Sequence, residues 1–264
     1  MSKCSVVNDD MIKIKKDIHN TQLYTVWFAE KPVTDAGIIQ YKEARFKNDR
    51  SEDFITLESD LTESEEDIKA HFSKGCKYKV NRAYREDITF HIFENDAITD
   101  EMLNSFLDFF EEFWASKGTG LSDRASLFDE MIRYRNTQAL TLAFATVNSV
   151  PAVYHTHIFD DRVARLLHSA SLYRLKGDEE GNTKNIIGMA NRALHFEEIK
   201  YFKLKGISVY DWGGAGTGED VASITEFKES FGGKHVVYNE FETVNGMKAH
   251  MINGLSGLKH KIKG

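Results

Sequence analysis

The chain has 264 residues, of which 41% are apolar and 28% are charged, with two cysteines and two prolines. This composition is typical of a folded globular protein and excludes disordered and collagen-like chains. No apolar run reaches the roughly 18–20 residues that cross a bilayer, and the first ten residues lack the apolar segment of a signal peptide, so we expect a cytoplasmic protein without a membrane span.

Charge and cysteine usage narrow the function classes further. The formal net charge of −7 argues against a protein whose whole surface binds duplex nucleic acid, because such binding depends on neutralising phosphates. Cys4 and Cys76 stand alone, without a CxxC motif or a ligand cluster, so neither a disulfide nor a structural metal site is expected.

The first third of the chain predicts two strands, at 24–29 and 54–59, and a helix that starts at Thr62. A basic segment follows in residues 73–86, and five cations lie in it without an intervening acid: Lys74, Lys77, Lys79, Arg82 and Arg85. Such a block is either a solvated helix face or an anion site, and both interpretations stay open here.

The rest of the chain alternates helices and strands. A strand at 88–93 precedes a helix whose apolar stripe, from Leu103 to Trp114, is interpreted as core, and a second helix runs from the cap Ser122 to Arg135. The later elements are strands at 140–147, 151–159 and 162–171, a helix at 183–205, a strand at 207–212, a helix at 219–231 and a strand at 235–241. Two-residue connectors join the first three of these strands, which predicts an antiparallel meander.

This order predicts an α+β (mixed α/β) fold around one sheet, because helices interrupt the strands at both ends but not in the middle. We expect a central mixed, largely antiparallel sheet flanked by helices. Residues 1–86 would form a reduced N-terminal subdomain that includes the basic segment, and residues 87–264 would form the main domain.

The candidate catalytic residues lie in the second half of the chain. Asp211 ends a strand and precedes a glycine-rich turn at 213–218, which has neither a Walker nor a Rossmann spacing. His155 and His157 share one face of their strand, and His168 lies on the next strand; proton transfer or substrate contact is favoured over a metal site. No GxSxG motif predicts a serine nucleophile.

Three segments in this order resemble the GNAT acyltransferase fold and, within it, the Fem-like branch of aminoacyl-tRNA-dependent peptidyltransferases. They are KYKVNRAYRE (77–86), VYDWGG (209–214) and FKESFGG (227–233), and the resemblance covers residues 54–241. It implies transfer of an acyl or aminoacyl group from an activated donor to an amine, without a covalent enzyme intermediate. The donor would lie between two splayed central strands, at 162–171 and 207–212.

The resemblance also implies roles for individual residues. Asp211 and His168 would assist proton transfer. The other implied site residues contact substrates: Lys77, Lys79, Arg82 and Arg85 would hold an acceptor phosphate or tRNA; Ser169, Ser171, Tyr173, Gly213 and Gly214 would lie near the reacting atoms; and Tyr154, His155 and Lys228 would line the cleft.

Donor and acceptor are left open by the sequence. No permanently bound cofactor is expected, and the co-substrate would be aminoacyl-tRNA or acyl-CoA. Residues 172–185 carry the acids Asp178 to Glu180 where coenzyme-A-dependent GNAT enzymes have a pyrophosphate loop. The acceptor would be an amine on a phosphorylated or nucleotide-linked cell-envelope precursor or a small metabolite. The alternatives are an acetyl-CoA-dependent N-acetyltransferase with an atypical phosphate loop and a non-catalytic GNAT-like module that binds RNA or an acidic partner; the oligomeric state is not predicted.

Overall fold

The chain forms two compact units. The computed structural model describes residues 11–18, 21–121, 123–174, 181–216 and 219–246. The first unit comprises residues 1–55 and 236–264, and the second comprises residues 56–235. Residue 86, the boundary that the sequence predicts, lies inside the second unit, and the chain returns to the first unit in its last strand. The assignment of residues 1–86 and 87–264 to a reduced subdomain and a GNAT-like domain stays a prediction.

The first unit holds a small sheet with the strand order β1-β2-β3-β10. Its strands are β1 (Ile12–Ile18), β2 (Thr21–Trp27), β3 (Gly37–Ala44) and β10 (Lys234–Asn245). β2 and β3 are parallel, whereas β1 and β10 pair with them antiparallel. Tyr41 of β3 stacks on Phe241 of β10, with ring centroids 4.6 Å apart. A core of its own therefore holds this sheet together.

The second unit holds the sheet that positions the cleft described below, with the strand order β4-β9-β8-β7-β6-β5. Its strands are β4 (Glu52–Asp60), β5 (Ile88–Glu94), β6 (Leu140–Val147), β7 (Val150–Phe159), β8 (Val163–Ser171) and β9 (Val209–Gly214). Only β8 and β9 are parallel neighbours in this order, so the mixed, largely antiparallel sheet is confirmed.

The hairpins of the meander form for local reasons. Asn148 and Ser149, between β6 and β7, have positive φ angles of 51° and 65°, as a type I′ turn requires. Between β7 and β8, the Asp160 carboxylate accepts hydrogen bonds from the backbone N–H groups of Arg162 and Val163 at 2.8 and 2.7 Å. Both turns fix the register of the strands that they join.

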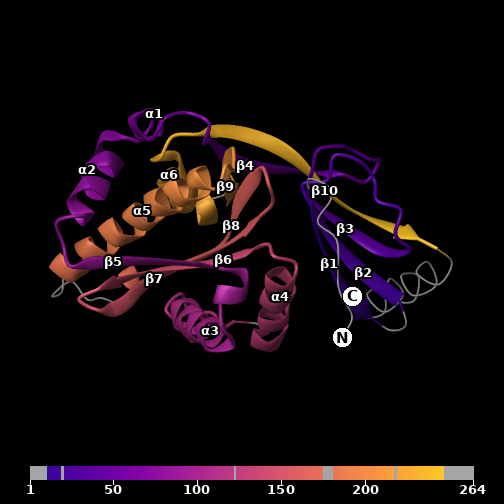
Figure 1. Ribbon diagram of the computed structural model, residues 1–264, viewed down its shortest axis with the longest axis horizontal. Helices are drawn as coiled ribbons and strands as arrows, with labels where there is room; N and C mark the ends of the chain where they lie inside the picture. The colour runs from indigo at the N-terminus through magenta and orange to yellow at the C-terminus, as the bar shows by residue number, and fades with distance from the viewer. Residues whose placement is uncertain (1–10, 19–20, 122, 175–180, 217–218, 247–264) are drawn as a thin grey trace. The chain divides into compact units, whose positions relative to one another are not determined.

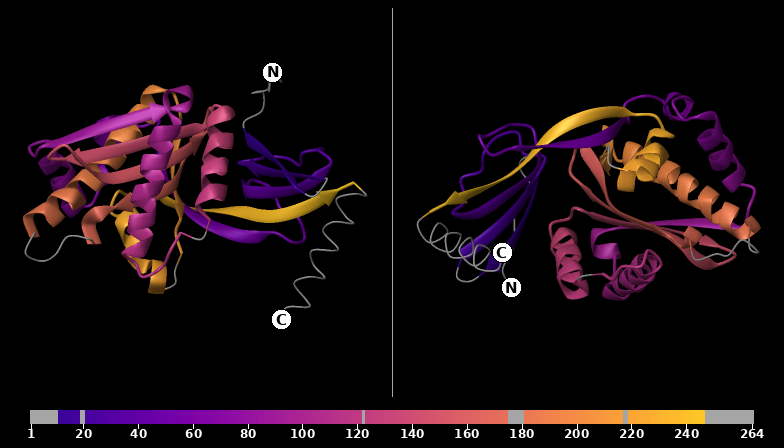
Figure 2. Two further views of the ribbon diagram at one scale, coloured as in Figure 1. Left: turned by 90° about the horizontal axis from the view of Figure 1, so that it is seen from below. Right: turned by 180° about the vertical axis from the view of Figure 1, so that it is seen from behind.

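Helices cover both faces of this sheet (Figure 1). The helices are α1 (Glu65–Ala70), α2 (Lys74–Ala83), α3 (Asp100–Ala115), α4 (Arg124–Asn136), α5 (Gly181–Leu204) and α6 (Glu219–Glu229), with short 3-10 turns at Asn95–Ala97 and Leu172–Arg174. α5 and α6 lie on one face, and α3 and α4 lie on the other, as the views of Figure 2 also show. None of the described helices combines the length and apolar character that a membrane span requires.

The helix starts differ from the sequence expectation in one region. The helix expected to start at Thr62 is α1, which Ser64 caps, and the basic segment forms its own helix, α2. The Ser73 hydroxyl caps α2 by accepting a hydrogen bond from Cys76 N at 3.2 Å. α1 has already ended at Ala70, with His71 as its C-cap, and the strong N-cap Ser73 starts α2. α4 is capped by Asp123, and the expected cap Ser122 lies outside the described residues.

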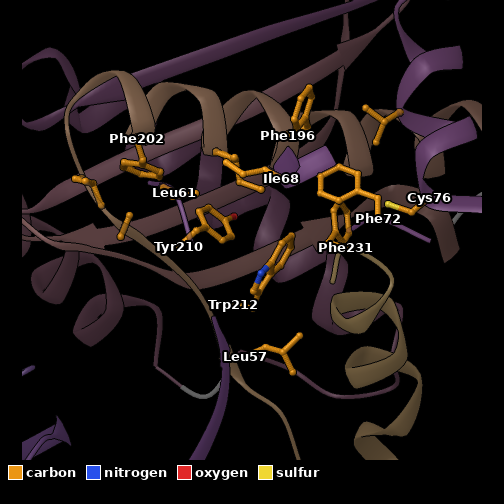
Figure 3. Packing of buried hydrophobic residues seen from close by; sticks show 14 of the residues in the cluster. Leu57, Leu61, Ile68, Phe72, Cys76, Phe196, Phe202, Tyr210, Trp212 and Phe231 are labelled. Carbon is orange, nitrogen blue, oxygen red and sulfur yellow. The ribbon is translucent and has the colours of Figure 1, made fainter. Parts of the chain in front are cut away.

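An apolar core packs α5, α6 and β9 together (Figure 3). Trp212 of β9 is fully buried, and its ring centroid lies 4.5 Å from that of Phe231, directly after α6. Gly232 follows with a φ of 77°, and a Cβ there would meet His71 Cβ at 2.6 Å. Glycine is therefore required at this turn, which holds Phe231 against Trp212.

Candidate functional site

β8 and β9 separate after a short stretch of pairing. Their parallel ladder holds from Val163 opposite Val209 to Arg165 opposite Asp211, whereas β8 continues to Ser171 and β9 to Gly214. The separation expected for these two strands is present in the structure.

A cleft of about 1130 Å³ opens where the strands part. Because the sheet is interrupted there, the cleft is lined from both faces. Phe110, Phe113 and Trp114 of α3 line it from one side, and residues of α5 and α6 line it from the other. Among its described lining residues, Glu226 is the one acid, whereas five are basic: Lys79, Lys117, Arg165, Arg192 and Lys228. The cleft suits a large ligand that is partly flat and partly negatively charged.

The end of β9 is held in a fixed shape. Gly213 has a φ of 69°, and a Cβ there would lie 3.0 Å from the carbonyl oxygen of Leu166. Asp211 Oδ1 accepts a hydrogen bond from Gly213 N at 2.7 Å, and Lys228 Nζ donates to the carbonyl oxygens of Gly213 and Gly214 at 3.1 and 2.7 Å. Only glycine fits this approach of the two strands without strain.

Asp211 was expected near the reacting atoms but lies outside the cleft lining. Its side chain is fully buried, accepts a hydrogen bond from the Thr56 hydroxyl as well as from Gly213 N, and does not line the cleft. It therefore shapes the turn at the end of β9, and these contacts give no support for a direct part in proton transfer.

His168 lies in the cleft wall, as expected. Its Nδ1 lies 2.8 Å from the Thr156 hydroxyl, and its ring packs edge-on against Phe110 with centroids 5.2 Å apart. Burial, and secondarily the charge of Arg165, lowers the pKa of His168 to about 4. The imidazole is therefore neutral at pH 7, and in the described residues its Nε2 has no hydrogen-bond partner.

The basic helix α2 gives one cation to the cleft. Lys79 lines it, whereas Lys77, Arg82 and Arg85 do not. Lys77 Nζ reaches the carbonyl oxygen of Ala70 at 3.4 Å, Arg82 pairs with Glu86 at 2.7 Å, and Arg85 is exposed. Most of the basic segment is thus a solvated helix face, which is the first of the two interpretations of the sequence.

Arg192 of α5 is a cleft cation that the sequence interpretation missed. It lies over the ring of Phe227 at 4.7 Å and donates to the carbonyl oxygen of Gly188 at 3.2 Å. Burial and the charge of Arg192 lower the pKa of Lys79, which places the two cations near each other. In the described part of the chain neither cation pairs with a carboxylate, and this leaves them available to an anionic ligand.

The remaining expected residues divide into two groups. The cleft is lined by five of them: Ser169, Ser171, Tyr173, Gly214 and Lys228. Tyr154 and His155 are buried and do not line it. Tyr154 packs against Phe109 with ring centroids 4.9 Å apart, on the face that α3 covers. The acids Asp178 to Glu180 lie outside the described residues.

The aromatic stripe of α3 does two things. Leu103, Phe106 and Leu107 are buried core, as expected. Phe113 and Trp114 instead line the cleft, and Lys117 Nζ lies 4.2 and 4.9 Å from their ring centroids. The 3.6-residue period identified the stripe but could not show that its last turn extends past the sheet into the cleft.

A fully buried polar cluster lies between β7 and α5. Glu198 Oε1 lies 2.7 Å from His155 Nδ1, and Glu198 Oε2 accepts a hydrogen bond from the Tyr210 hydroxyl at 3.0 Å. The same hydroxyl lies 2.9 Å from His157 Nε2 and 2.8 Å from His195 Nδ1. Burial lowers the pKa of His157 to about 4 and that of His195 to about 3, so both rings are neutral at pH 7.

Among the described residues, this cluster contains the group of side chains whose nitrogen and oxygen atoms could together bind a metal ion. One such atom each from His155, His195 and Glu198 lies within 4.8 Å of the others. The Tyr210 hydroxyl lies within hydrogen-bonding distance of His195 Nδ1 and Glu198 Oε2, and thereby occupies the space between them. The donor set therefore fits a hydrogen-bonded network better than a metal site.

Comparison with known proteins gives matches in structure but not in sequence. No protein-family model matches the chain, and no curated protein matches it. The crystal structure of FemX superposes with a TM-score of 0.56 at 12% identity and covers 76% of this chain. A conserved protein of unknown function from Bacteroides thetaiotaomicron superposes with a TM-score of 0.54 at 10% identity, covering 89% of this chain and 83% of its own.

The chain spans 63% of the length of FemX. The chain therefore shares its fold with FemX.

Proposed function

We propose that the chain is an N-acyltransferase that moves an acyl or aminoacyl group from an activated donor to an amine. The observation that carries this proposal is the separation of β8 and β9 beyond Arg165 and Asp211, which opens the sheet into the cleft. A gap between two strands could admit an extended thioester or ester, and the fold shared with FemX agrees with the resemblance of the sequence to Fem-like acyltransferases.

The transfer needs little from the protein beyond placement. The amine nitrogen attacks the carbonyl carbon of the donor, the bond from that carbon to the leaving sulfur or oxygen breaks, and the amine loses a proton. His168 is the cleft residue best suited to receive that proton, since its ring is neutral at pH 7 and its Nε2 is unpaired in the described residues. Asp211 serves as a positioning residue that holds Gly213 and thereby the end of β9.

Lys79 and Arg192 define the end of the cleft that would bind an anionic group. Both lack a carboxylate partner in the described residues, and both line the same cleft from adjacent helices. A phosphate on the acceptor or on the donor would pair with them. This supports an acceptor of the phosphorylated or nucleotide-linked kind, a cell-envelope precursor or a small metabolite, with aminoacyl-tRNA or acyl-CoA as the donor.

The direct test is acyl transfer by the purified chain. Acetyl-CoA and aminoacyl-tRNA are each incubated with amine acceptors that do and do not carry phosphate, and products are detected by mass spectrometry. We expect an acylated amine from one donor class. Ser169→Trp, which fills the cleft beside β8, should abolish the product, whereas Ser105→Trp on the exposed face of α3 should not.

Thermal stability distinguishes the donors independently of turnover. A donor that binds the folded chain raises its melting temperature, by an amount that follows from its concentration and affinity. Stabilisation by coenzyme A in wild type but not in Ser169→Trp would identify acyl-CoA as the donor. No transfer and no stabilisation with either donor class would refute the proposal.

A further inference from the structure

A chain of hydrogen bonds runs from the protein interior to the wall of the cleft. Glu198 Oε1 lies 2.7 Å from His155 Nδ1, and His155 Nε2 lies 2.9 Å from Asn191 Oδ1. The side chains of His155 and Glu198 are 0% and 1% exposed, whereas Asn191 lines the cleft. Hydrogen bonds thus connect the buried carboxylate of Glu198 to Asn191, a side chain that a ligand in the cleft can contact.

Four members of the cluster have pKa values shifted by their surroundings. Burial would raise the pKa of Glu198, but the neighbouring His155 and His157 lower it far below its usual range, so Glu198 is ionised. His157 and His195 are neutral at pH 7, and the Tyr210 hydroxyl keeps its proton because burial raises its pKa.

His155 connects this carboxylate to Asn191. An amide oxygen can only accept a hydrogen bond, so His155 Nε2, which faces Asn191 Oδ1 at 2.9 Å, is the donor of this contact. The other ring nitrogen, Nδ1, faces Glu198 Oε1.

An amide that accepts a hydrogen bond through its oxygen turns its NH₂ group elsewhere. Asn191 Nδ2 has no partner in the described residues, and the residue lines the cleft, so the two N–H groups face open space. A donor that is held in place before the reaction stabilises negative charge on a carbonyl oxygen without having to reorient.

We propose that Asn191 donates a hydrogen bond to the carbonyl oxygen of the acyl donor, and that His155 and Glu198 are positioning residues that hold its NH₂ group toward the cleft. This inference rests on the proposed acyl transfer. As the amine nitrogen bonds to the carbonyl carbon, the electron pair of the C=O bond moves onto oxygen. Asn191 stabilises that oxygen until the C=O bond re-forms and the bond to the leaving sulfur or oxygen breaks; the leaving atom receives a proton in place of the one that the amine loses.

Kinetics of three variants test the catalytic role. Asn191→Ala should lower kcat by on the order of 100-fold, since loss of one such donor has effects of that size. Asn191→Asp keeps the shape but replaces the donor by an acceptor, and should show a similar loss. Asn81→Ala removes the same side chain from an exposed position of α2 that does not line the cleft, and should change kcat by less than about twofold. An equal loss in Asn81→Ala, or a rise in KM alone in Asn191→Ala, would overturn the proposal.

Nitrogen NMR of the wild-type protein tests the positioning role without an activity assay. The ¹⁵N shifts of His155 should show a proton on Nε2, the ring nitrogen that faces Asn191 Oδ1, and the Asn191 NH₂ group should show no coupling to the ring. A deprotonated Nε2 would mean that Asn191 donates its N–H to His155 and that its amide oxygen faces the cleft. That result would overturn the proposal independently of the kinetic results. If wild type transfers no acyl group, the proposed function fails, and the NMR result still decides how Asn191 is oriented.

Discussion

The buried histidines make folding stability sensitive to mild acid. In the folded protein His157 and His195 take up a proton only near pH 4 and pH 3, because burial lowers the pKa of each ring. In the unfolded chain both take up a proton near pH 6.5. The unfolded state therefore binds more protons than the folded state below pH 6.5, and stability falls as the pH falls from there toward 4.

The size of this effect follows from the difference in pKa. Between pH 7.5 and pH 5.5 each of the two histidines should reduce the free energy of unfolding by roughly 1 kcal/mol, and together by roughly 2–3 kcal/mol. His168, whose pKa is also lowered to about 4, adds to the loss but is partly open to the cleft and contributes less. Glu198 acts in the same direction only below its unfolded pKa, near 4.5, because its folded pKa is lower.

Urea unfolding, followed by tryptophan fluorescence, measures this loss at pH 7.5 and at pH 5.5. Trp212 is buried next to His195, with ring centroids 4.9 Å apart, and reports on the same unit. His157→Gln removes one titrating group and should lose roughly 1 kcal/mol less than wild type over this range. A wild-type free energy of unfolding that does not change between the two pH values would refute the argument, and so would an equal loss in wild type and variant.

Three further substitutions test the packing and the cleft. Gly213→Ala should lower the free energy of unfolding by roughly 1–3 kcal/mol, because its φ of 69° disfavours a side chain and the new Cβ would lie 3.0 Å from Leu166 O; an unchanged urea midpoint would contradict this. Phe231→Ala should cost about 3–5 kcal/mol by opening a cavity beside Trp212, measured in the same way, and a loss below about 1 kcal/mol would contradict the packing described. Lys79→Ala should weaken binding of phosphate-bearing ligands in titration calorimetry by about tenfold, whereas Arg82→Ala, which removes an exposed cation of the same helix, should leave it unchanged; equal effects would contradict an anion site in the cleft.

Much of the second unit was predictable from the sequence because local signals there are strong. The two-residue connector at Asn148 and Ser149 predicted a hairpin that the structure confirms. The period of apolar residues predicted α3, and Gly206 marked the end of α5 correctly. The first unit was harder to predict, because β1 alternates isoleucine with lysine and because β3 pairs with β10, which is distant in the sequence.

The site was only partly predictable, for a different reason. His168 was identified by its place on a strand, Gly213 by its place in the turn after a strand, and Lys79 by its charged block. The structure brings all three to one cleft. Asn191 and Arg192 were missed because an asparagine and an arginine in a long helix carry no motif. Their role depends on which turn of α5 faces the gap between β8 and β9, and only the packing of that helix on the sheet determines this.

The measurement that tests the central claim most directly is a crystal structure of the protein with an unreactive amide analogue of the acyl donor. The account predicts ligand density between β8 and β9, beside Ser169 and Gly213, with the carbonyl oxygen within hydrogen-bonding distance of Asn191 Nδ2. Density that lies outside the gap between these strands, with the cleft filled only by water, would contradict it.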